Sequence, residues 1–75
     1  MSAAETVIDA RGLMPPEPLE LTLAALDDLA RDGEIVLLLY REPFPLYQIL
    51  QQNGYAHRTE FREDGTVAIC IRHAD

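Results

Sequence analysis

The chain has 75 residues, 48% of them hydrophobic and 25% charged, which is the composition of one globular domain and leaves no room for a second. Thirteen acidic residues against six basic ones give a net charge of −7, and such a charge disfavours nucleic acid and anionic membrane surfaces as partners. With no apolar run near the roughly 20 residues that cross a bilayer, no signal-peptide pattern and one cysteine, the sequence predicts a cytoplasmic protein without an intrachain disulfide.

The N-terminal third predicts a strand followed by a helix. We expect residues 1–5 to be disordered and residues 6–9 to form a short strand, because β-branched side chains precede a turn. Three prolines between Pro15 and Pro18 forbid a helix interior but suit its first turn, so the helix should begin near Glu17 or Pro18. Gly33 is expected to end it in the left-handed conformation. The spacing of a helical face assigns these side chains to the core: Leu19, Thr22, Leu23, Leu26, Leu29 and Ala30.

The rest of the chain predicts a strand, a helix and a hairpin. Residues 34–40 include five consecutive apolar positions, which is typical of a buried central strand. After a loop with two prolines, a helix of about ten residues should end at Asn53 and Gly54. Residues 55–62 and 66–73 read as antiparallel strands joined by a three-residue loop with Gly65 in the left-handed position.

This hairpin loop predicts a register in which Phe61 pairs with Val67 and Thr59 pairs with Ile69. The element order is then β-α-β-α-β-β. Because crossovers between parallel strands are right-handed, both helices should cover one face of a mixed four-stranded sheet, giving a two-layer α/β sandwich. Alternation along the hairpin turns one set of side chains toward the helices: His57, Thr59, Phe61, Val67, Ile69 and Ile71. The other set lies on the uncovered face: Arg58, Glu60, Arg62, Ala68, Cys70 and Arg72.

The segment Asp9-Ala10-Arg11-Gly12-Leu13-Met14-Pro15-Pro16-Glu17-Pro18, opening a helix, resembles the signature Asp-x-Arg-Gly-Leu-x-Cys-Pro-x-Pro of the TusA-like (SirA-like) sulfur-carrier proteins. Pro15 stands where those carriers have cysteine. Together with Glu42-Pro43-x-Pro45-Leu46, the chain is most similar to the thiol-less relatives known as domain of unknown function family 2249. The resemblance extends from Val7 to Arg72 and implies the same fold and a link to sulfur or redox pathways.

The resemblance also bears on activity, because the carriers hold sulfur as a persulfide on the motif cysteine. Proline has no atom that accepts or passes on sulfur, so carrier activity is not inherited through Pro15. The scaffold can persist without that activity.

If the first two strands are parallel, the loops that follow them meet at one sheet edge, where open α/β sheets bind ligands. We expect a binding site there for a protein partner or a small anion. The alternative is a salt-bridged pair of loops whose prolines only limit the entropy of the unfolded chain. The candidate residues are Asp9, Arg11, Pro15, Pro16, Glu17, Pro18, Arg41 and Glu42.

Cys70 provides a rival hypothesis. On the uncovered face it would lie across from Arg58 and near Arg72, and basic neighbours favour the reactive thiolate. The alternative is that Cys70 is a small packed apolar residue, which is the more common role of a single cysteine in a strand. His57, His73 and Cys70 match no zinc spacing, and the sequence contains no catalytic triad, phosphate loop or dinucleotide motif.

The sequence therefore predicts a non-enzymatic binding or adaptor domain. It has no cofactor and engages a redox or sulfur-handling protein, as a monomer or weak dimer. The alternative is a small sulfur carrier that acts through Cys70.

Overall fold

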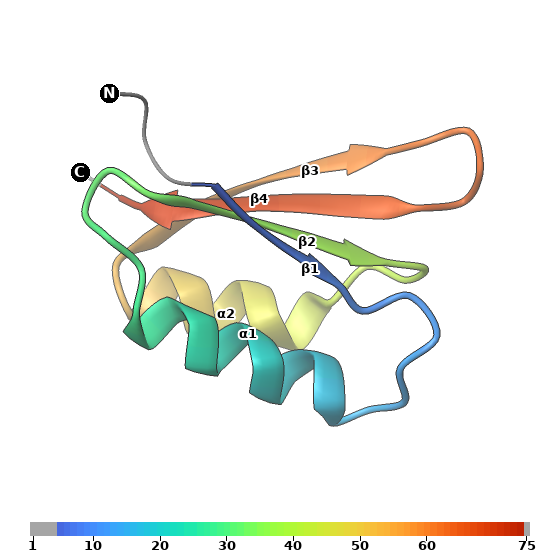
Figure 1. Cartoon of the computed structure of the whole chain (residues 1–75), viewed down its shortest axis with the longest axis horizontal. Helices are drawn as coiled ribbons and strands as arrows, with labels where there is room; N and C mark the ends of the chain where they lie inside the picture. Colours follow the sequence, from blue (N-terminus) through green and yellow to red (C-terminus); the bar gives the residue numbers. More distant parts are fainter. Residues whose placement is uncertain (1–4, 75) are drawn as a thin grey trace.

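The computed structural model describes residues 5–74, and it places two helices on one face of a four-stranded sheet (Figure 1). The strands lie in the order β1-β2-β4-β3. β1 is parallel to β2, and the other neighbours are antiparallel. The predicted two-layer sandwich is confirmed. Its elements are β1 (Glu5–Asp9), α1 (Glu17–Asp27), β2 (Glu34–Leu39), α2 (Phe44–Gln52), β3 (Tyr55–Phe61) and β4 (Val67–His73).

The core lies between the sheet and the helices and is built on the two central strands. Ile35 and Leu37 of β2 and Ile69 and Ile71 of β4 are at most 1% exposed. Leu50 of α2 closes the core from the helical side. The continuous apolar run of β2 thus reflects a strand with a neighbour on each side, as the sequence predicted.

The N-terminus departs slightly from expectation. Glu5 was expected to be disordered, but it pairs with Glu34 as the first residue of β1. The other residues expected to be disordered, 1–4, lie outside the described residues.

The buried face of α1 is narrower than the sequence predicted. Thr22 and Leu26 are buried, whereas Leu23 and Ala30 are exposed. Leu23 lies roughly 80° around the helix from the line through Thr22 and Leu26, and Ala30 follows the end of the helix at Asp27. The helix therefore ends about one turn earlier than its apolar spacing indicated, and fewer of its side chains are buried.

The predicted role of Gly33 is wrong, because its φ is not positive and α1 ends six residues earlier, at Asp27. A Cβ at Gly33 would lie 2.9 Å from Leu29 Cδ1 and 3.2 Å from the carbonyl oxygen of Ala30. The glycine is required by close packing of the chain after α1. Positive φ occurs at Gly12, Gly54 and Gly65 instead, and that of Gly65 was predicted.

The β3–β4 hairpin has the predicted register, with Phe61 opposite Val67 and Thr59 opposite Ile69. Val67, Ile69 and Ile71 face the core. Phe61, which was expected to face the helices, is 66% exposed. The end of this hairpin extends beyond the helices (Figure 1), so no helix is available to cover it.

None of the helices in residues 5–74 has the length and apolar character that crossing a membrane requires.

Candidate functional site

A cleft lies between the first loop (residues 10–16) and the second loop (residues 40–43). Because β1 and β2 are parallel, both loops leave the sheet at the same edge. They enclose a volume of about 600 Å³, and the core residues Leu37, Leu39 and Leu46 form its floor. The walls are mostly apolar: Leu13, Met14, Pro15, Pro16, Tyr40 and Pro43.

The mouth of this cleft exposes large apolar side chains. Met14 is 73% exposed and Tyr40 is 61% exposed, and both residues line the cleft. Phe44, the first residue of α2, follows Pro43 of the second loop and is 65% exposed. Exposed apolar groups that gather around a hollow mark an interaction surface.

The structure brings together only part of the predicted site. The residues that line the cleft are Pro15 and Pro16 of the first loop, Pro18 of α1, Arg41 and Glu42. Glu17 is exposed at the start of α1, next to the cleft but not in its wall. Asp9 and Arg11 also lie outside it and belong to a separate network.

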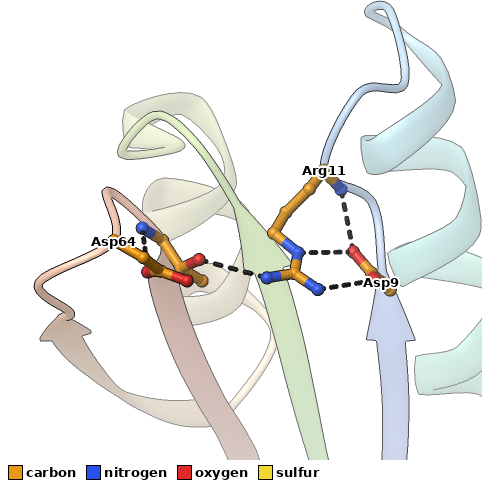
Figure 2. A network of polar contacts seen from close by, with 4 residues as sticks. Asp9, Arg11 and Asp64 are labelled. Carbon is orange, nitrogen blue, oxygen red and sulfur yellow. Dashed lines mark hydrogen bonds and ion pairs between the residues drawn. The ribbon is translucent and has the colours of Figure 1, made fainter.

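Arg11 links the end of β1 to the β3–β4 hairpin across the uncovered face of β2 (Figure 2). Its Nε donates a hydrogen bond to Asp9 Oδ1 and its Nη2 to Asp9 Oδ2, both at 2.9 Å, and the Arg11 backbone N–H donates to Oδ1 at 3.2 Å. These contacts lower the pKa of Asp9 to about 2 and raise the pKa of Arg11.

On its far side, Arg11 Nη1 donates to Thr66 Oγ1 at 3.2 Å. Thr66 is 1% exposed, and its backbone N–H donates to Asp64 Oδ1 at 2.9 Å, which lowers the pKa of Asp64. The Asp9–Arg11 pair therefore anchors the first loop to Thr66, on the face of the sheet opposite the cleft.

The second loop is held by Tyr47, which the sequence did not single out as a site residue. The Tyr47 hydroxyl donates to Glu42 Oε2 at 3.1 Å and lies 2.6 Å from Thr59 Oγ1. Its ring stacks on His57, with centroids 4.3 Å apart. Burial raises the pKa of Tyr47. Tyr47 thus turns the Glu42 carboxylate toward β3. The sequence did not indicate this contact, because Glu42 precedes α2 and lies five residues from Tyr47, whereas helical neighbours are three or four apart.

Cys70 lies on the uncovered face of the sheet, on the opposite side from the cleft. It is partly buried, and Arg58 Nη2 donates a long contact to its Sγ at 3.9 Å. Glu34 and Arg72 complete a hollow of about 80 Å³ around it. The predicted basic setting is present, but the sheet separates this thiol from the cleft. Across residues 5–74, no three His, Cys, Asp or Glu residues come close enough to hold a metal ion.

Comparison with known proteins agrees with this architecture. The family described as "Uncharacterized conserved protein (DUF2249)" matches residues 7–73. A crystal structure of a SirA-like protein from Desulfitobacterium hafniense superposes with a TM-score of 0.79, covering 88% of this chain and 93% of that chain at 23% identity, which shows the fold. A search of the curated proteins gives no match. The resemblance inferred from the Asp9–Pro18 signature is confirmed, and the chain belongs to the DUF2249 family of uncharacterized conserved proteins and has the SirA-like fold.

Proposed function

We propose that this domain is a non-enzymatic binding module that docks a protein partner of sulfur or redox metabolism in the cytoplasm. The observation that carries this proposal is the apolar cleft between the two proline-rich loops, with Met14 and Tyr40 exposed at its mouth. Rigid loops lose little conformational entropy on binding, so such a surface is suited to recognition.

The composition of the cleft favours binding over chemistry. Pro15 lines the cleft at the position where the resembling carriers have their sulfur-bearing cysteine. The charged side chains in the wall are Arg41 and Glu42, and Glu42 already accepts a hydrogen bond from Tyr47. Binding of a partner without a chemical step is therefore the simplest function for a cleft that has no nucleophile at this position.

A protein partner fits the cleft better than a small anion does. Helix N-termini bind anions through free backbone N–H groups, but Pro18 has none and the Glu17 N–H donates to the carbonyl of Met14. The Glu20 N–H likewise donates to Pro16. With these donors removed and the walls apolar, the cleft is suited to an apolar segment of another protein.

The test compares two substitutions of the same kind at exposed apolar positions. Met14→Glu places a charge at the mouth of the cleft, and Leu21→Glu places one on α1, where Leu21 is 46% exposed and does not line the cleft. A cleft partner would be captured from a lysate by the wild type and by Leu21→Glu but not by Met14→Glu. Calorimetry with each purified candidate should then show similar affinity for the first two proteins and weaker binding to Met14→Glu. Equal capture by both variants would reject the cleft as the docking site.

The alternative function is a sulfur carrier that works through Cys70, favoured by the contact between Arg58 and its Sγ. In that reaction Cys70 would take the outer sulfur of a persulfide donor and release the donor as a thiol. Incubation with a cysteine desulfurase and cysteine, followed by mass spectrometry, decides between the two functions. A gain of about 32 Da on Cys70, the mass of one sulfur atom, absent from Cys70→Ser, would support the carrier, and an unchanged mass would eliminate it.

A further inference from the structure

The face of the sheet opposite the helices has no helix over it (Figure 1), and the residues at its centre are apolar. Val36 and Leu38 of β2 lie beside Cys70 and Ala68 of β4 in register. Leu38 and Ala68 are already buried by their neighbours, whereas Val36 and Cys70 are only half-buried. Val7 extends this apolar strip to the edge strand and is 57% exposed. The Arg11 side chain crosses β2 at one end of the strip, and no described helix covers the rest of it.

Charges of opposite sign occupy the two halves of this face. Glu5 and Glu34 are direct partners in the β1–β2 register. On the other half, Arg58 lies opposite Cys70, and Arg72 is the next residue of β4 on the same face. Among residues 5–74 these four side chains form no ion pair with one another. Like charges held side by side on a sheet are destabilising. The acidic and basic halves meet along the seam between β2 and β4, where Glu34 and Arg72 are neighbours and line the same hollow.

The other end of the same face is already neutralised. Asp9 pairs with Arg11 at 2.9 Å, and Glu60 pairs with Arg62 at 3.0 Å. The four charges that form no ion pair thus lie at one end of the sheet, with the carboxylates over β1 and β2 and the guanidinium groups over β4 and β3.

We propose that a second copy of this chain packs on the uncovered face, related by a two-fold axis that runs along the seam between β2 and β4. This rotation lays the acidic half of each copy over the basic half of the other. Glu34 of each copy then meets Arg72 of the other, and Val36 meets Cys70. Both contacts occur twice, as a two-fold interface requires.

The size of the face sets the strength of this dimer. Four strands about 4.8 Å apart and about six residues long present roughly 400 Å² in projection, well below the roughly 800 Å² per partner of a stable interface. The dimer is therefore weak and forms at high protein concentration. It leaves the cleft open, because the cleft and the interface lie on opposite faces of the sheet, so this inference stands or falls separately from partner docking.

Sedimentation equilibrium of the full chain over a wide concentration range tests the inference. Glu34→Arg and Arg72→Glu each place like charges at the two symmetric contacts between Glu34 and Arg72. Each should raise the dimer dissociation constant by about tenfold or more. The double variant Glu34→Arg/Arg72→Glu restores opposite charges and should recover the wild-type constant. Asp27→Arg, an exposed change on α1, is the matched control and should have little effect.

A measurement on the unaltered chain makes the test independent of variant folding. The half-buried thiol of Cys70 would be covered in the dimer, so its rate of reaction with a thiol reagent should fall as protein concentration rises, and added salt should reverse the fall. A wild-type chain that stays monomeric at about 1 mM would overturn the inference. So would a dimer that Glu34→Arg and Arg72→Glu weaken no more than Asp27→Arg does.

Discussion

Arg11 and Thr66 lie 55 positions apart in the chain, yet Arg11 Nη1 donates a hydrogen bond to Thr66 Oγ1 at 3.2 Å. Because Asp9 holds the same guanidinium, this contact ties the first loop of the cleft to the start of β4. The signature residues Asp9 and Arg11 thus support the cleft from the opposite face of the sheet and do not line it. Their substitution should act first on stability.

Replacing Thr66 with valine should lower the free energy of unfolding by about 1 to 2 kcal/mol. The two side chains have nearly the same shape, but Thr66 is buried and valine cannot accept the hydrogen bond from Arg11. Urea denaturation measures the change. Thr6→Val, at an exposed position of β1, is the control and should have little effect. An equal loss in both variants would mean that the Arg11 contact adds nothing.

The stabilising effect of Asp9 should disappear in acid. Its pKa is about 2 in the folded protein and about 4 in an unfolded chain. The unfolded state therefore takes up the proton first, and the stability that the carboxylate contributes is lost as pH falls from about 4 to about 2. Thermal unfolding across this range should show wild type converging on Asp9→Asn. Arg11→Met, which removes the guanidinium, should show the same loss of pH dependence. Parallel curves for all three proteins would contradict the assignment.

Removing the Tyr47 hydroxyl should destabilise the protein at neutral pH and matter less in alkali. Tyr47→Phe breaks the contacts to Glu42 and Thr59 at a cost of about 0.5 to 1.5 kcal/mol. Because the pKa of Tyr47 is raised in the folded state, the unfolded chain loses its proton first as pH rises above about 10, and the benefit of the hydroxyl declines there.

A double-mutant cycle between Tyr47→Phe and Thr59→Val isolates the shorter of these contacts, in which the two oxygens lie 2.6 Å apart. Urea denaturation at neutral and alkaline pH gives all the required values. Additive losses in the cycle would show that the Tyr47 and Thr59 hydroxyls do not stabilise each other. A cost of Tyr47→Phe that stays the same in alkali would contradict the raised pKa of Tyr47.

Gly33→Ala should cost about 1 kcal/mol or more, because the new Cβ meets Leu29 Cδ1 at 2.9 Å and the carbonyl oxygen of Ala30 at 3.2 Å. Leu29→Ala removes the nearer of these atoms. The glycine substitution should therefore cost less in that background than in the wild type, which unfolding measurements on the four proteins of the cycle can show. The same cost in both backgrounds would place the obstruction at the backbone of Ala30 instead.

Where local rules agreed, the sequence predicted the fold down to individual pairs. Gly65 takes the positive φ that the hairpin loop requires, and apolar alternation along β4 then leaves one register that buries Ile69 and Ile71. Two prolines followed by Glu17 and Pro18 marked the start of α1 correctly. The end of α1 was missed, because Gly33 serves close packing and the apolar spacing continues past the last helical residue, Asp27.

The sequence by itself determined the element order, the meeting of the two proline-rich loops, and the absence of a nucleophile at Pro15, since each follows from residue type and from parallel pairing of β1 and β2. Only the tertiary structure decided where the charged residues of those loops point. Arg11 turns to Thr66 and Glu42 turns to Tyr47 because long-range hydrogen-bond partners lie there. A long polar side chain can reach either face of a loop, and packing selects between them.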